Sequence, residues 1–296
     1  MSPALVQRTV ARVLVDESHA QAWTIRPEIA AAINPSHPGD SSYAAAAALL
    51  AGRDFEVAAH TAGALTPAIL ADVDVLVVPH MSDPRWEKVV PGGAPVLLPA
   101  ELDAIEAFVR AGGGLVVLAE EEQDKYGSNL GELLARFGIV VENALVQDYG
   151  SHRSIPTWVL AEPVPAAERL GLWSRVDAAC FYRAGTLRAT GDAVLVARTT
   201  ATADPARAGL VAAAEHGRGR VVALADSDLV SDDCIDDFGN ARLWLNVVYW
   251  AALRAFERPA SDVPSDVASD PAWLRLRDAT DALRLLEDGA DASLLA

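Results

Sequence analysis

The chain is short of cysteine, of aromatic residues and of basic residues, and these shortages exclude several classes of protein. Only 2 of its 296 residues are cysteines, Cys180 and Cys234, and they form no CxxC pair. That number is too small for a disulfide scaffold. Its 24 Lys and Arg stand against 41 Asp and Glu, which gives a net charge of −17. Because nucleic acids and anionic lipids bind concentrated basic surfaces, we expect neither a nucleic acid nor a membrane as a partner.

Long apolar runs are also missing. The longest candidate, residues 244–256, ends in charge and falls short of the roughly 20 apolar residues that cross a bilayer. The opening MSPALVQRTVARVLVDE lacks the apolar stretch and the small-residue cleavage site of a secretory signal. We therefore expect a cytoplasmic protein. Aromatic residues make up 6% of the chain, so its core is expected to be largely aliphatic.

The chain does contain a regular alternation of apolar runs and helical segments. Strands are predicted at residues 11–16, 55–60, 73–80, 115–119 and 139–142, a hairpin at 209–228, and helices at 42–52, 66–73, 99–111, 128–138 and 240–256. This alternation is typical of βαβ units, in which helices connect parallel strands. The predicted fold class is α/β, with a doubly wound, mostly parallel sheet.

The alternation predicts one main domain followed by a tail. The α/β domain spans residues 1–256 and carries a β-rich insert at about 144–207, where short β-rich pieces replace the helices. Residues 257–271 are rich in Pro, Ser and Asp, which is typical of a linker. Residues 272–296 form a predicted C-terminal amphipathic helix. That helix could pack on its own domain, on a second copy in a homo-oligomer, or on another protein.

Ionisable residues follow four of the predicted core strands. Ligands of open parallel sheets bind beyond the carboxyl ends of the strands, where such turns share one edge. The candidate ligand-binding residues are Asp16, Glu17, His19, His80, Glu120, Glu121, Asp226 and Asp228. Crowded acids raise one another's pKa, or attract a cation or a donor-rich ligand. We therefore predict a polar pocket at this edge.

The chemistry of that pocket has several interpretations. His19 could act as a general base oriented by Asp16 or Glu17, but a loop histidine more often bonds a backbone carbonyl, and we favour that interpretation. A magnesium site at Asp226 or Asp228 is an open alternative. The segment 226–237 is not an EF-hand loop, because Ser231 and Asp237 replace the required glycine and glutamate.

Five segments resemble the class I glutamine amidotransferase-like superfamily. They read DVLVVPH, LLPAELDAIEAFVRAGGGLVVLAE, SNLGELLARFGI, GRGRVVALADSDL and NARLWLNVVYWAA. The match is closer to a bacterial branch that includes trehalose-utilisation-like and gliding-transport-like proteins, and it covers about residues 10–256. The resemblance implies a flavodoxin-like fold, and fold alone does not establish activity.

The sequence lacks the residues that glutamine hydrolysis requires in this superfamily. In amidotransferases a cysteine occupies the tight turn after a core strand, whereas Glu120 and Glu121 follow the matching strand here. No phosphate loop, HExxH or GxSxG motif is present either, so we assign no catalytic residue and no cofactor. The first hypothesis is a non-catalytic domain that binds a small polar ligand such as a sugar, or a protein partner. The alternative is a metal-assisted hydrolase that uses Asp16, His19, His80 and Asp226.

Overall fold

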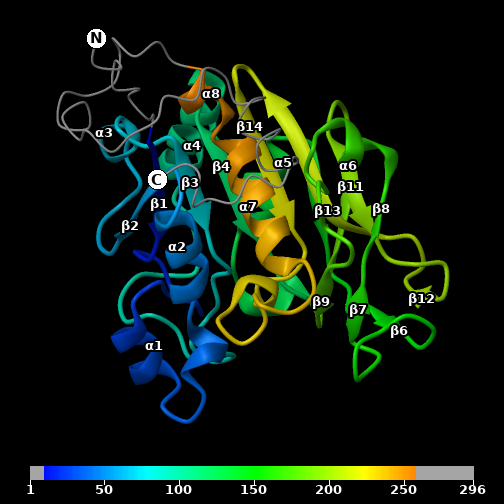
Figure 1. Cartoon of the computed structure of the whole chain (residues 1–296). Coiled ribbons are helices and arrows are strands. Elements are labelled where there is room, and N and C mark those ends of the chain that lie inside the picture. Colours follow the sequence, from blue (N-terminus) through cyan, green and yellow to red (C-terminus); the bar gives the residue numbers. More distant parts are fainter. Residues whose placement is uncertain (1–9, 258–296) are drawn as a thin grey trace, which may run out of the picture.

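A mixed ten-stranded sheet forms the centre of the computed structural model, which describes residues 10–257 (Figure 1). Five parallel strands run in the order β2-β1-β3-β4-β14. They are β1 (Ala11–Asp16), β2 (Phe55–His60), β3 (Val75–Val78), β4 (Gly114–Leu118) and β14 (Gly219–Leu224). Every residue of β3 and β4 is buried, as expected for central strands that are covered on both faces.

Antiparallel strands extend the sheet beyond β14. Beside it lie β13 (Gly209–His216), β10 (Thr186–Ala189) and β5 (Ile139–Glu142), and β11 (Val194–Arg198) and β8 (Glu162–Pro163) branch from β13. Two smaller sheets pair β6 (Gln147–Asp148) with β12 (Ala203–Asp204) and β7 (Trp158–Leu160) with β9 (Cys180–Tyr182). Most of these strands fall in the segment 144–207, and the exceptions are β5 and β13. The fold is thus α/β, with a mostly parallel central sheet and added antiparallel strands.

Eight α-helices and three short 3-10 turns are present among the described residues. The helices are α1 (Pro27–Ile33), α2 (Ala44–Ala51), α3 (Pro67–Leu70), α4 (Pro99–Ala111), α5 (Leu130–Ala135), α6 (Pro165–Arg169), α7 (Asn240–Ala251) and α8 (Leu253–Phe256). The 3-10 turns are η1 (Pro38–Ser41), η2 (Gln123–Tyr126) and η3 (Asp228–Val230). None of these helices has both the length and the apolar composition needed to cross a membrane.

Two glycines show that α4 and α7 cover opposite faces of the sheet. A Cβ on Gly114 would lie 2.4 Å from the carbonyl oxygen of Ala251 in α7. A Cβ on Gly219 would instead lie 2.0 Å from the carbonyl oxygen of Val109 in α4. Arg220 pairs with Gly114 across the strands, and neighbouring side chains on a strand point to opposite faces. Helices α4 and α7 therefore cover opposite faces of the sheet, which we call the α4 face and the α7 face.

Local sequence signals explain where several helices begin. Helix α4 starts at Pro99, as predicted, and its Glu101 carboxylate accepts a hydrogen bond from the Leu98 N–H at 2.8 Å. Helix α3 starts after Thr66, whose hydroxyl accepts from the Ile69 N–H at 3.3 Å. Both are side-chain caps for N–H groups that a helix leaves unpaired.

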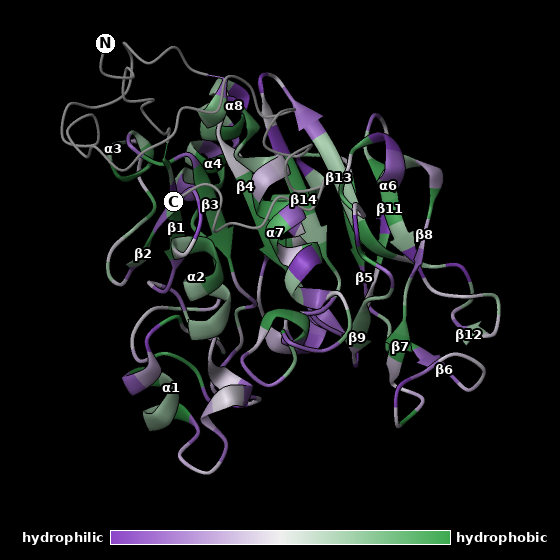
Figure 2. Ribbon diagram, viewed as in Figure 1, coloured by the Kyte–Doolittle hydropathy of each residue, from purple (hydrophilic) through white to green (hydrophobic). Residues whose placement is uncertain are grey.

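Other boundaries differ from the sequence predictions. The predicted helix 240–256 is divided into α7 and α8 at Ala252, and the helix predicted at 128–138 covers only Leu130–Ala135. Helix α1 was not predicted, because its short PEIAAAI run lacks a polar cap. The predicted tail, with its linker 257–271 and helix 272–296, lies outside the described residues except for Glu257. Figure 2 shows that the strands of the parallel half are mainly hydrophobic, in keeping with their burial.

Candidate functional site

The turns after β1, β3, β4 and β14 form one connected edge of the sheet. The Ala22 N–H donates to the His80 carbonyl oxygen at 3.2 Å, which joins the first turn to the second. Gln123 Nε2 lies 3.4 Å from His80 Nδ1, which joins the second turn to the third. The Ser227 N–H donates to Glu120 Oε1 at 3.3 Å, which joins the third turn to the fourth. The structure therefore places all four polar turns side by side, as the parallel topology predicted.

Asp16 is fully buried and anchors the turn that follows it. Its Oδ1 accepts from the Ser18 N–H at 3.0 Å and from the Ser18 hydroxyl at 2.8 Å. Its Oδ2 lies 2.7 Å from both His19 Nδ1 and Gln21 Nε2. Both carboxylate oxygens of Asp16 are thus engaged within its own loop.

His19 lies between two carboxylates rather than against a backbone carbonyl. Its Nε2 is 3.3 Å from the Glu101 carboxylate of α4, on the side opposite to Asp16. Burial alone would lower the pKa of His19, but the hydrogen bond and charge of Asp16, followed by those of Glu101, raise it above the ordinary value. The interpretation we favoured from the sequence, a bond to a backbone carbonyl, is therefore wrong. The neighbouring carboxylates favour the protonated ring.

Glu17 is also buried, and it holds the segment that leads into α1. Its carboxylate accepts from the Thr24 hydroxyl, the Ile25 N–H and Arg26 Nε, each at 2.7 Å. Because all three donors belong to its own chain segment, the contacts of Glu17 define the shape of the loop.

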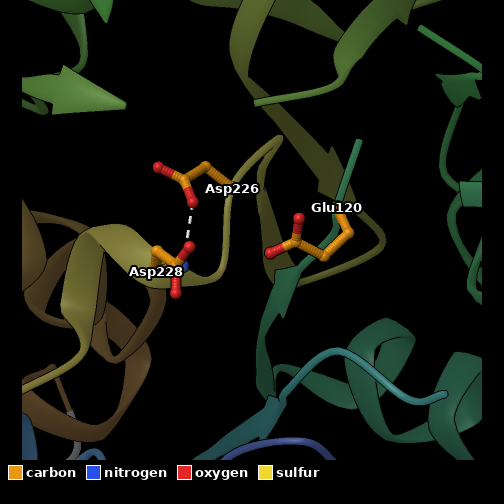
Figure 3. Close-up of side chains that lie close together, drawn as sticks. All are labelled: Glu120, Asp226 and Asp228. Atoms are coloured by element: carbon orange, nitrogen blue, oxygen red, sulfur yellow. Dashed lines mark hydrogen bonds between the residues drawn. The ribbon is translucent and has the colours of Figure 1, made fainter. Parts of the chain in front are cut away.

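A second group of acids, Glu120, Asp226 and Asp228, gathers on the α7 face (Figure 3). Leu118 pairs with Leu224 across parallel strands, so Glu120 and Asp226, each two residues further on, point to the same side. One ligand atom from each acid lies within 4.8 Å of the others. Val15 pairs with Val77, and Val77 pairs with Val116, so Val15 lies on the same α7 face as Val116. Asp16 is the next residue of β1 and therefore points to the α4 face. Asp16 and the three acids therefore lie on opposite faces at one edge of the sheet.

The two innermost acids of this group are largely satisfied by the protein. Asp226 accepts from the Tyr182 N–H at 2.6 Å and from the Asp228 N–H at 2.8 Å. Glu120 accepts from the Ser227 hydroxyl. Burial, followed by the charge of Asp228, raises the pKa of Asp226 well above its usual value. Burial, followed by the hydrogen bond with Glu121, does the same for Glu120.

Asp228 differs from its neighbours because it is only partly buried and its carboxylate makes no hydrogen bond to another described residue. Burial, and then the charges of Asp40, Glu121 and Glu87, raises its pKa to about 7. It is the member of the group that a molecule from solution can reach.

The raised pKa of Asp228 predicts how stability depends on pH. Between about pH 4 and pH 7 the unfolded chain has lost this proton while the folded chain keeps it, so rising pH lowers stability across that range. The difference from the ordinary value of 3.8 corresponds to about 4 kcal/mol, and solvent screening reduces the expected effect to about 2 kcal/mol.

Asp228→Asn should therefore be about 2 kcal/mol more stable than the parent at pH 8 and equal to it at pH 3.5. Urea denaturation at both pH values measures this, with the exposed Asp124→Asn as control. A parent and variant with parallel pH profiles would contradict it.

Glu121 and His80 are engaged in contacts of a different kind. Glu121 Oε1 accepts from Lys125 Nζ and Arg183 Nη2, both at 2.9 Å. Burial would raise the pKa of Glu121, but hydrogen bonds with Glu120, Lys125 and Arg183 lower it to about 2. His80 is fully buried, and its Nε2 lies 3.0 Å from Glu87 Oε2. Seven of the eight predicted site residues are buried, and the exception is Asp228.

Sequence reasoning missed two buried residues at this edge, Gln21 and Trp23. The Trp23 ring stacks on Tyr43 with centroids 5.9 Å apart and meets His80 edge-on at 6.0 Å. Gln21 Oε1 and Trp23 Nε1 are buried, and neither makes a hydrogen bond within the described part of the chain. Both residues follow Asp16 within seven positions, so the polar turn after β1 was the signal that could have indicated them.

Neither cysteine is suited to act as a nucleophile. Cys180 is fully buried in β9, and burial raises the pKa of its thiol to about 12. Burial also raises the pKa of the Cys234 thiol to about 12. Because the thiolate is the reactive form, these raised pKa values keep both thiols mainly in the less reactive protonated form near neutral pH.

The fold and this edge define an α/β protein with a mostly parallel sheet and a polar carboxyl edge. Residues 89–248, which are 160 of the 296, match the model of the family described as Domain of unknown function (DUF4350). The chain belongs to the DUF4350 family. The matched region contains Glu120, Glu121, Asp226 and Asp228 but not Asp16, Glu17, His19 or His80. No curated protein matches the chain.

Several solved structures share the fold at low sequence identity. The N-terminal domain of mmIFT52 has a TM-score of 0.65 at 16% identity, over 81% of this chain and 97% of that one. The cytoplasmic protein STM3548 from Salmonella typhimurium has a TM-score of 0.51 at 14% identity, over 82% and 99%. A ThuA-like protein from Bacteroides uniformis ATCC 8492 has a TM-score of 0.50 at 13% identity, over 88% and 96%. At these identities the likeness establishes the fold alone.

Proposed function

We propose that the chain is a non-catalytic binding domain of glutamine amidotransferase-like fold that recognises a small polar ligand, such as a sugar, at the carboxyl edge of its sheet. The strand order β2-β1-β3-β4 and the helices on both faces support a doubly wound, flavodoxin-like layout. The ThuA-like structural neighbour is consistent with it. The observation that carries the proposal is Asp228, a partly exposed carboxylate that accepts no hydrogen bond from another described residue and lies close to two buried acids.

The environment of Asp228 favours hydroxyl groups over other ligands. Carboxylates accept hydrogen bonds from hydroxyls, and buried acids that keep their proton can donate to a hydroxyl oxygen. Arg183 and Lys125 are bound to Glu121, so they leave little free positive charge for a phosphate. Because Glu120 and Asp226 are buried, a small molecule suits the site better than a protein surface does.

The proposal does not use cysteine chemistry, because desolvation raises the pKa of both thiols to about 12. The test is calorimetry with glucose and trehalose, combined with thermal unfolding in their presence. We expect binding that Asp228→Asn weakens at least about tenfold, equal to about 1.4 kcal/mol, while Asp124→Asn leaves it unchanged. If neither sugar produces heat or a stability shift at millimolar concentration, the sugar site is contradicted. Binding of a protein at this edge would show that the ligand is a protein partner instead of a sugar.

A divalent cation is the second candidate ligand, and one observation favours it. Glu120, Asp226 and Asp228 form the one group of three potential ligands found among residues 10–257, and oxygen ligands suit Mg²⁺ and Mn²⁺. The structure does not bring Asp16, His19 and His80 into this group. Asp16 binds Ser18, His19 and Gln21, and His19 also contacts Glu101. His80 contacts Glu87 and Gln123. A metal-assisted hydrolase would therefore use the acidic group on the α7 face.

Metal analysis of the purified protein separates the two candidates. A bound cation predicts a higher melting temperature with Mg²⁺ or Mn²⁺, and loss of that increase in Asp228→Asn. Metal-free protein whose melting temperature ignores Mg²⁺, Mn²⁺ and Zn²⁺ would exclude the cation and leave the sugar proposal in place.

A further inference from the structure

Three arginines line one cavity on the outer side of α2 and α7, away from the carboxylate group. The cavity has a volume of about 510 Å³. Arg53 follows α2, Arg175 precedes β9, and Arg242 lies in the first turn of α7. None of these guanidinium groups forms an ion pair with another residue of the described chain. Asp177 is the acidic residue of the lining, so the cavity walls carry a charge of 3 − 1 = +2 in a protein of net charge −17.

Arg242 carries positive charge that no ion pair with another described residue compensates. Its Nη1 atom is buried and makes no hydrogen bond within the described residues. Burial, followed by repulsion from Arg53 and Arg175, lowers the pKa of Arg242 below its usual value. Arg242 as a whole is half-buried, so its guanidinium group loses part of its hydration, and that loss costs free energy when no partner replaces the water.

The start of α7 adds a second source of positive potential to the cavity. This helix of 12 residues has no acidic residue in its first turn. The Asn240 N–H donates to the Asp237 carbonyl oxygen, and the helix dipole favours an anion near this end. Gly239 allows the close approach, because its N–H donates to the Ala178 carbonyl at 2.8 Å and a Cβ would lie 2.7 Å from the same oxygen. The segment that carries Arg175 and Asp177 is thereby held against the helix.

Two residues of the lining adopt a backbone conformation that side chains disfavour. Arg175 has a φ of 56° and Phe238 a φ of 50°, and such strain persists only where the surroundings impose it. Phe238 is 54% exposed, and it shares the cavity wall with Leu49 and Leu245. The cavity lining therefore combines cationic side chains with apolar and aromatic ones.

We propose that this cavity binds a small molecule that carries a phosphate group on an apolar or aromatic body. A phosphate dianion matches the +2 charge of the lining, and guanidinium groups bind its oxygens in bidentate fashion. The apolar wall of Phe238, Leu49 and Leu245 would contact the rest of the ligand. The net charge of −17 repels extended polyanions, which selects a small ligand over a nucleic acid. This site is independent of the function proposed for the carboxyl edge.

Calorimetry of the full chain with phenyl phosphate and with inorganic phosphate, at matched ionic strength in chloride, tests the proposal. We expect both to bind, phenyl phosphate at least about tenfold tighter because of the apolar wall. Arg242→Gln and the exposed Arg175→Gln should each weaken phenyl phosphate binding at least about tenfold. Arg169→Gln, an exposed arginine outside the cavity, changes the net charge equally and should leave binding unchanged.

Thermal unfolding distinguishes a binding role of Arg242 from a structural one. In chloride alone, Arg242→Gln should unfold at the same or a higher temperature, because it removes a half-buried charge that forms no ion pair with another described residue. In phenyl phosphate it should lose the stabilisation that the parent gains. A lower melting temperature in chloride, equal weakening by Arg169→Gln, or no binding of either phosphate by the parent at millimolar concentration would overturn the proposal.

Discussion

Asp16→Ala should lower the free energy of unfolding by about 3–5 kcal/mol. The substitution removes the acceptor for Ser18, His19 and Gln21 at once, and the side chains of His19 and Gln21 are buried. A buried donor without its acceptor costs about 1–3 kcal/mol, and two or three such groups give the expected sum. Urea denaturation at pH 6 measures the effect.

The exposed Asp124→Ala serves as control and should change stability by less than about 0.5 kcal/mol. The effect of Asp16→Ala should also depend on pH. Because the pKa of His19 is raised in the folded chain, its contribution is complete below the unfolded value of about 6.5 and is lost as pH rises through the folded value. The difference between parent and Asp16→Ala should therefore be larger at pH 6 than at pH 9. A loss below about 1 kcal/mol at pH 6 would show that Asp16 does not anchor its loop.

Gly219→Ala should destabilise the protein by about 3 kcal/mol or more. The added Cβ would lie 2.0 Å from the carbonyl oxygen of Val109 and 2.3 Å from that of Gly113. Both are backbone atoms, Val109 in the last turn of α4 and Gly113 two residues after the helix ends. No side-chain rotation relieves the contact, so this backbone must move away from the sheet. Thermal or urea unfolding measures the loss.

Gly131→Ala provides the matched control with the opposite sign. Gly131 lies inside α5, and a Cβ there would meet nothing within 4 Å. Alanine is the better helix former by about 1 kcal/mol, so this variant should be more stable than the parent. If both substitutions have the same effect, the close packing of α4 on β14 does not determine stability at Gly219.

Several elements were predictable because their signals are local. Residues 11–16, 55–60 and 139–142 form strands with the predicted bounds, since each is an apolar or β-branched run with turn residues around it. Helix α4 was likewise bounded by Pro99 and by glycines that follow Ala111. Helix α1 has Pro27 in its first turn but spans only 7 residues and has no side-chain cap, and the last helix is divided at Ala252 without a proline or glycine, so neither was predicted.

The candidate site was predictable only in part. The parallel topology was enough to bring the turns of His80, Glu120 and Asp226 to one edge. The contacts of His19 with Glu101, and of Trp23 with Tyr43, depend on helices that pack against that edge from elsewhere in the chain. The sequence contains no local pattern for such pairs.

By itself, the sequence determined the alternation of strands and helices and the edge at which polar side chains collect, because periodicity and turn residues act over a few positions. Only the tertiary structure decided that Asp16 turns to the α4 face while Glu120 and Asp226 share the α7 face with Asp228. Only it brought Arg53, Arg175 and Arg242 around one cavity. The physical reason is that strand register and helix packing join residues far apart in the chain, and a shift of register by one residue moves every side chain to the other face.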